Sequence, residues 1–224
     1  MDISALLHNI ALIALPLLFG ITLHEAAHGW VAKQCGDRTA WLLGRVSLNP
    51  ARHIDWFGTV FLPILMLVVS SFTFAFGWAK PVPITWQNLN NPRRDAALVA
   101  AAGPLANLVM AIFWACIAKL GLFVTTVSPT IPATWTAQFA YATGLFGINL
   151  NVLLMLLNLL PLPPLDGSRI LSSLLPPALA AQYARLEPYG IWILLGLFAL
   201  GGLNRLLLPP VFLVTSLIRQ TIGV

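Results

Sequence analysis

Long apolar runs, separated by short polar stretches, dominate this chain and predict membrane-spanning helices. Four runs of membrane length cover residues 3–33, 95–124, 135–160 and 189–208, and about 20 apolar residues suffice to cross a bilayer as a helix. A further apolar run covers residues 56–76. The pattern therefore predicts an all-α polytopic membrane protein with about four to five transmembrane helices.

The stretches between these runs predict smaller elements. Residues 41–49 are short, apolar-rich and bounded by Asn-Pro, and prolines keep residues 80–84 extended, so we expect short β-strand elements near the candidate site. A strand edge there could pair with an extended substrate. Pro209-Pro210 should break the last run, and 211–224 should form an interfacial helix.

Composition agrees with a membrane protein. The chain has 224 residues, of which 58% are hydrophobic and only 8% charged, with a mean hydropathy of +0.86, whereas soluble chains carry about 25% charged residues. We expect one integral-membrane domain over 1–224, with a core at 3–175 and a C-terminal span and tail at 189–224. The net charge of +5 comes from scattered basic residues, which excludes a nucleic-acid-binding class and points to lipid partners.

The pentapeptide His24-Glu25-Ala26-Ala27-His28 lies inside the first apolar run. On a helix the two histidines share a face and can bind one metal ion, while Glu25 can act as a general base on a metal-bound water. Ionisable groups are costly in apolar surroundings, so such a cluster indicates a functional site. The predicted chemistry is peptide-bond hydrolysis within or beside the bilayer.

Asp166 is the best candidate for a third ligand, because it is the carboxylate that ends a later apolar run. Catalytic zinc usually takes three protein ligands and a water. The alternative is that Asp166 caps the helix that follows it. If it is a ligand, the runs at 3–33 and 135–160 must be parallel, which requires an odd number of crossings between them.

Basic residues predict the orientation. They follow the first run and flank 56–76 on both sides, which places the N-terminus outside and the candidate site near the cytoplasmic face of the cell membrane. The basic residues on both sides of 56–76 then lie on the same face of the membrane. This agrees with an odd number of crossings between the runs at 3–33 and 135–160 if 56–76 is a re-entrant segment that returns to the face it entered from.

Other polar groups and prolines near the motif have two interpretations each. Asn158, Pro161 and Pro163 can shape a loop that presents Asp166 and bind substrate backbone, or they can simply end a helix. Asn107, in Gly103-Pro104-Leu105-Ala106-Asn107, can support a ligand or belong to a stretch of close helix packing. His53 can join the metal site or shuttle protons, or it can be a capping histidine.

Taken together, HEAAH at 24–28, GPLAN at 103–107 and NLLPLPPLDG at 158–167 resemble the site-2 protease family of intramembrane zinc metalloproteases. The resemblance implies one Zn²⁺ held by His24, His28 and Asp166, Glu25 as the catalytic acid and base, and a transmembrane protein as substrate. No segment is long and polar enough for a PDZ or CBS domain, so the chain resembles a minimal type.

Two other functions remain open at this level. A metal-binding transporter would also use broken helices with acidic and amide side chains, although we find no internal repeat. A membrane hydrolase that acts on a lipid-linked substrate would use the same metal chemistry. Substrate identity and oligomeric state are not encoded in any motif that we recognise.

Overall fold

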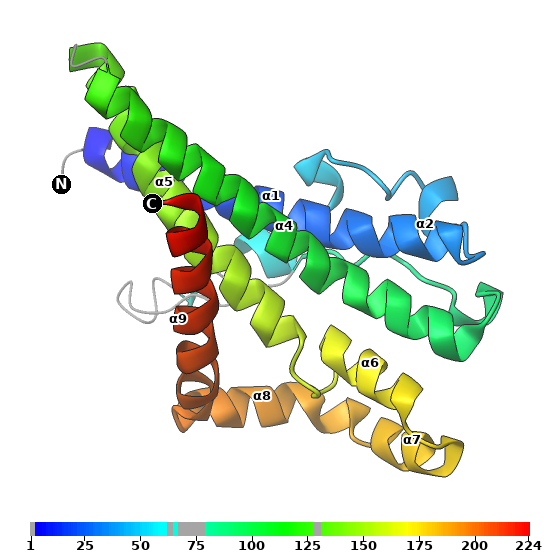
Figure 1. Cartoon of the computed structure of the whole chain (residues 1–224). Helices are drawn as coiled ribbons and strands as arrows, with labels where there is room; N and C mark the ends of the chain where they lie inside the picture. The colour runs from blue at the N-terminus through cyan, green and yellow to red at the C-terminus, as the bar shows by residue number, and fades with distance from the viewer. Residues whose placement is uncertain (1–2, 62–64, 67–78, 128–130) are drawn as a thin grey trace.

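Three long helices form the centre of the molecule (Figure 1). The computed structural model describes residues 3–61, 65–66, 79–127 and 131–224. Helices α1 (Ile3–Gln34), α4 (Pro92–Val127) and α5 (Ile131–Asn158) are long and apolar enough to cross a membrane. α1 and α5 run in the same direction and α4 runs opposite to both, which is the parallel arrangement that a shared metal site requires.

Small residues bring α4 and α5 close together. Ala115 and Ala118 of α4 are fully buried, Gly144 of α5 faces Ala118, and Gly147 faces Trp114. A Cβ at Gly144 would lie 2.6 Å from the Ala118 backbone nitrogen, and one at Gly147 would lie 2.3 Å from the Trp114 ring. Helices in lipid associate through this kind of close packing, because burying apolar surface gains nothing there.

The C-terminal part of the chain forms four shorter helices, α6 (Asp166–Leu174), α7 (Pro177–Ala184), α8 (Gly190–Ala199) and α9 (Gly202–Ile222). The first three lie below the long helices in Figure 1, and α9 runs from the end of α8 back up to α4 and α5. The prediction of one helix over 189–208 is wrong, because the chain bends by 80° between α8 and α9. Gly201 has φ +69° and ends α8 in the left-handed conformation that glycine adopts easily.

The expected break at Pro209-Pro210 is also wrong. Both prolines lie inside α9, and the expected tail helix at 211–224 is its second half. Val211, Val214 and Ile218 of α9 pack against the buried cluster of α4 and α5. This packing outweighs the two hydrogen bonds that the prolines remove.

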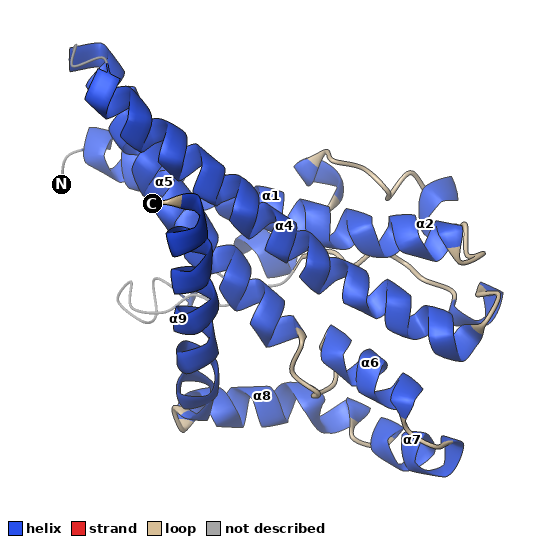
Figure 2. Ribbon diagram, viewed as in Figure 1, coloured by secondary structure: helices blue, strands red, loops and turns tan. Residues whose placement is uncertain are grey.

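No β-strand occurs in the part of the chain that the structure describes (Figure 2), so the expectation of strand elements is also wrong. The predicted strand at 41–49 begins instead with the helical turn α2 (Thr39–Leu42). The chain then turns at Gly44, with φ +64°, and the Arg45 N–H bonds back to the Ala40 carbonyl. The segment at 80–84 is extended, but its backbone groups bond to side chains and loops rather than to a neighbouring strand.

Short helical turns complete the described structure. They are Pro50–Arg52, Trp56–Phe61, Trp86–Asn88 and Glu187–Tyr189. Counting the bent pair formed by α7–α8 and α9 as one span gives four candidate spans among the described residues, the lower end of the predicted number. Most of the apolar run at 56–76 lies outside the described residues.

Candidate metal centre and active site

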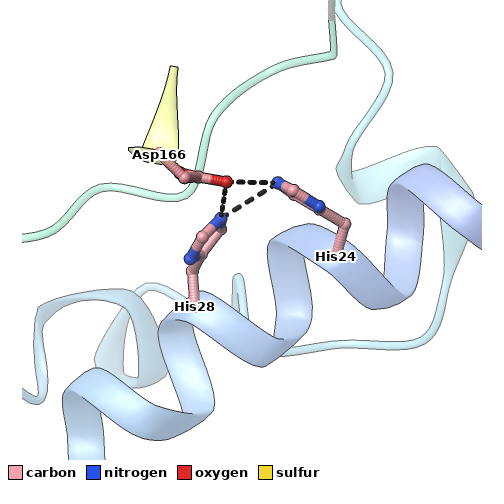
Figure 3. A group of neighbouring side chains, drawn as sticks. All are labelled: His24, His28 and Asp166. Carbon is pink, nitrogen blue, oxygen red and sulfur yellow. Dashed lines mark hydrogen bonds and ion pairs between the residues drawn. The ribbon is translucent and has the colours of Figure 1, made fainter. Parts of the chain in front are cut away.

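His24 and His28 point from one face of α1 toward Asp166 (Figure 3). The two residues are one helical turn apart and share a face, and their Nε2 atoms converge to 3.0 Å. The Asp166 Oδ2 atom lies 3.2 Å from the His24 Nε2 and 3.3 Å from the His28 Nε2. One potential ligand atom from each of the three residues falls within a group no wider than 4.8 Å.

Helix α4 fixes the rings of both histidines through their Nδ1 atoms. The His28 Nδ1–H donates to the Val99 carbonyl at 2.7 Å, and the His24 Nδ1 lies 2.6 Å from the Asn107 Oδ1. Gly103 lies between them, and a Cβ there would be 2.4 Å from the His28 Nε2 and 2.6 Å from the His24 Nε2. Only a glycine allows α4 to approach the imidazoles this closely.

The hydrogen bonds also determine which ring nitrogen carries the proton. The Asn107 amide nitrogen donates to the Gly20 carbonyl at 3.3 Å and to the Asn151 Oδ1 at 3.2 Å, so its oxygen faces His24. The Asn151 nitrogen in turn donates to the Gly147 carbonyl. Each histidine therefore has its proton on Nδ1, and both Nε2 lone pairs face the carboxylate.

Asp166 reaches the histidines from the start of α6. It is the first residue of that helix, Leu165 holds the capping position, and no side chain caps the helix. The capping interpretation of Asp166 is therefore wrong. Gly167 allows α6 to start against the end of α5, because a Cβ there would lie 2.3 Å from the Leu159 carbonyl oxygen.

Three hydrogen-bond acceptors thus converge at one point. An anionic oxygen and two imidazole lone pairs at this spacing repel one another unless a cation lies among them, and two histidines with one carboxylate are ligands typical of catalytic zinc.

Glu25 lies on α1 next to this group and is half-buried. Its Oε2 atom accepts a hydrogen bond of 2.7 Å from the Val82 backbone N–H. Val82 belongs to the extended stretch at 79–85, which therefore passes beside the motif although it is more than fifty residues away in the sequence.

The other predicted site residues lie outside the group of three. The Asn158 amide nitrogen donates to the Leu154 carbonyl within α5, and the Pro161 carbonyl accepts a hydrogen bond from the Tyr183 hydroxyl. Pro163 is buried in the loop between α5 and α6. His53 is 2% exposed, and its Nε2 lies 2.9 Å from the Ser47 carbonyl oxygen.

Four contributors to the site were not predicted as such. Asn151 could have been found, because it is an amide inside an apolar run. Gly103 was noted only as part of a packing stretch. The Val99 carbonyl and the Val82 N–H are backbone groups, and no residue type signals them.

A polar network ties the chain after α1 to the stretch at 79–85. Asp37 is fully buried and accepts hydrogen bonds from the Thr39 hydroxyl, the Thr85 N–H and the Asn88 amide. Burial alone would raise the pKa of Asp37, but these hydrogen bonds outweigh it and lower that pKa. The ionised carboxylate thus holds two distant segments together.

Known proteins were compared with the whole chain. The model of "Peptidase family M50" matches residues 12–200. No solved structure matches. The chain is 40% identical over 191 residues to YwhC of Bacillus subtilis, named as a "Putative zinc metalloprotease", and the alignment covers 83% of this chain and 79% of the relative.

Two further relatives are more distant. Rip2 of Mycobacterium tuberculosis (strain H37Rv), which carries the same description, is 29% identical over 187 residues, covering 84% of this chain and 66% of Rip2. The regulator of sigma-E protease RseP of Salmonella typhimurium is 31% identical over 112 residues, covering 49% of this chain and 25% of that protein. Because the family model spans most of the chain, and with it His24, His28 and Asp166, the chain belongs to peptidase family M50, the site-2 protease family.

Proposed function

We propose that this chain is a zinc-dependent intramembrane protease that cleaves transmembrane or membrane-adjacent segments of other proteins. The convergence of His24 Nε2, His28 Nε2 and Asp166 Oδ2 within 4.8 Å carries the proposal. Membership of a peptidase family supports the activity, and the zinc named in the descriptions of YwhC and Rip2 supports the choice of metal. His24, His28 and Asp166 would hold one zinc ion per chain.

Glu25 serves as the general base and then as the general acid. When bound, zinc acidifies its water and polarises the scissile carbonyl. Glu25 accepts a proton from that water through the oxygen that Val82 does not bind, and later donates it to the leaving amine. Asn107 keeps the proton of His24 on Nδ1, so that the Nε2 lone pair faces the metal position.

An apolar groove beside the motif supports a membrane-embedded substrate. It has a volume of about 370 Å³. Leu23, Ala27 and Trp30 of α1 form one wall and Val109 of α4 another. A groove of this character accepts the apolar side chains of a transmembrane segment better than those of a soluble peptide. Asn158, Pro161 and Pro163 shape the loop that presents Asp166, and we assign them no contact with the metal.

We further propose that the chain enters and leaves the apolar run at 56–76, most of which lies outside the described residues, on the same face of the membrane. A hydrogen bond of 2.9 Å from the Lys80 N–H to the His53 carbonyl supports this topology, because it joins the described residues on either side of the run. A single crossing would separate the two ends by roughly 30 Å. Cysteine accessibility that placed Ile54 and Trp86 on opposite faces of the membrane would contradict this topology.

The distribution of charge supports an orientation with the site near the cytoplasmic face. Basic residues flank the C-terminal end of α1 and the N-terminal end of α4, including Lys33, Arg38, Arg93 and Arg94. Short loops rich in Lys and Arg stay in the cytoplasm. The N-terminus then lies outside the cell membrane.

Metal analysis and a cleavage assay test the function together. The wild-type protein, purified without chelators, should contain about one zinc per chain, and Asp166→Ala should lose most of it. In liposomes the wild type should cut a model single-span protein, and Glu25→Gln should bind zinc without cutting. A wild type that holds zinc but processes only a lipid-linked substrate would replace the protease proposal with the hydrolase alternative.

A further inference from the structure

The extended stretch at 79–85, which we call the strap, lies beside the C-terminal half of α1. Its centre reads Pro81-Val82-Pro83. Because proline has no backbone N–H, Val82 supplies the single N–H donor of these three residues, and that donor binds the Oε2 of Glu25 at 2.7 Å. We propose that the strap is a positioning element for Glu25, with the Val82 N–H as the group that orients the catalytic carboxylate.

The strap is anchored on both sides of Val82. Before Val82, the Lys80 N–H donates to the His53 carbonyl at 2.9 Å, and the Arg45 guanidinium donates to the Lys80 carbonyl at 2.9 Å. After Val82, the Thr85 N–H donates to the Asp37 carboxylate at 2.8 Å. The donor that faces Glu25 is therefore fixed in space before any substrate arrives.

Packing against α1 sets the distance between the strap and the HEAAH motif. The Val82 side chain is 7% exposed, and it lies over Gly29, the residue after His28. A Cβ at Gly29 would lie 3.0 Å from the Val82 Cγ1 and 2.8 Å from the Val46 Cγ2. The absence of a side chain at position 29 thus allows the strap to reach Glu25.

Orientation matters because a glutamate side chain has three rotatable bonds. Among the described residues, the Val82 N–H makes the one hydrogen bond to the Glu25 side chain, and it engages a single oxygen. The other oxygen remains available to exchange a proton with water and with the leaving amine. A general base must lie within hydrogen-bond reach of its proton, and a displacement of about 1 Å can cost about 100-fold in rate.

This inference rests on the proposed protease function, and one substitution separates the two. Val82→Pro removes the donor and keeps the extended backbone, whereas Val82→Ala keeps the donor and shortens the side chain. We expect Val82→Pro to lower kcat about 10–100-fold, with KM and zinc content unchanged, and Val82→Ala to remain near wild type. If the wild type itself cuts no peptide, the proposed function fails instead.

Two results for Val82→Pro would overturn the inference. An unchanged kcat would mean that the contact does not orient the base. A raised kcat would mean that the strap restrains Glu25 away from the water. Equal losses in Val82→Pro and Val82→Ala would likewise assign the effect to packing and not to the N–H donor.

If Val82→Pro does not fold, solid-state NMR on protein with an intact strap tests the inference instead. The chain has two glutamates, Glu25 and Glu187, and Glu187 pairs with Arg169 on an exposed surface. In Glu187→Gln, labelling glutamate with ¹³Cδ and valine with ¹⁵N leaves Glu25 as the single labelled glutamate. Solid-state NMR on the zinc-loaded protein should detect dipolar coupling between the Glu25 carboxylate and a valine nitrogen, and its absence would overturn the inference.

Discussion

The histidines and the glutamate of the HEAAH motif are held by different parts of the molecule. His24 and His28 are fixed by helices, through the Val99 carbonyl and the Asn107 side chain of α4. Glu25 is held by a loop, through one backbone N–H of Val82. Metal ligands need a rigid position, which packed helices provide, whereas a proton-transferring group needs one oxygen oriented and the other accessible. Substitutions among the α4 and α5 groups that support the histidines, the helix side, should therefore change metal binding. Substitutions in the strap and its anchors, the strap side, should change turnover.

The strongest test of the helix side is Gly103→Ala. The new Cβ would lie 2.4 Å from the His28 Nε2, so the ring must shift although Val99 holds its other nitrogen. We expect zinc to be largely lost and proteolysis to be abolished, as measured by elemental analysis and substrate cleavage. Gly144→Ala is the matched control, because its Cβ would meet Ala118, away from the three ligands. Equal zinc loss in both variants would show that the effect is global.

Asn107→Leu should have the next largest effect. It removes the acceptor of the His24 Nδ1–H and leaves that donor buried without a partner. Loss of such a supporting group typically weakens metal affinity about 10–100-fold, and competition with a chelating dye measures it. Zinc affinity equal to that of the wild type would mean that the bond from Asn107 does not set the orientation of His24.

Asn151→Leu should act in the same direction but more weakly, because Asn151 reaches His24 only through Asn107. The matched control is Asn149→Leu, which removes an exposed amide bonded to the carbonyl four residues earlier. We expect a measurable fall in zinc affinity for the first variant and none for the second. The same chelator competition ranks both against Asn107→Leu. An equally large fall in zinc affinity for Asn149→Leu and Asn151→Leu would contradict the proposed support of His24 by Asn151 through Asn107.

Substitutions on the strap side should have the smallest effect on zinc content. Asp37→Asn weakens the hydrogen bonds that hold Thr39 and Thr85 together. We expect it to lower the free energy of unfolding by about 1–3 kcal/mol and to leave the zinc content intact. Denaturant unfolding in detergent measures the free energy of unfolding. Substantial zinc loss in Asp37→Asn would contradict the division between helix side and strap side.

The wild type should also show the contribution of Asp37 in its pH dependence. Because the pKa of Asp37 is lower in the folded state, its stabilising contribution is complete above the ordinary value of about 3.9 and is lost as the pH falls through the lower, folded-state pKa. Asp37→Asn should lack this acid-side loss.

Much of the site could be predicted from the sequence because the signals are local. HEAAH places His24 and His28 one helical turn apart, and an acidic residue at the end of an apolar run makes Asp166 a candidate ligand, although the sequence left open that it caps the next helix. The same kind of signal failed at 41–49 and at Pro209-Pro210. Strand formation depends on a partner that the sequence does not name, and the packing of α9 on α4 and α5 outweighs the helix-breaking tendency of proline.

The sequence alone predicted a helical membrane protein and named the candidate metal ligands, and it required the first and third long helices to run parallel if Asp166 is one of them. The groups that support those residues follow only from the three-dimensional packing. The Val99 carbonyl, the Val82 N–H and the space at Gly103 are backbone features. Every residue has a backbone, so the sequence cannot mark the few positions where the fold brings that backbone against a reactive side chain.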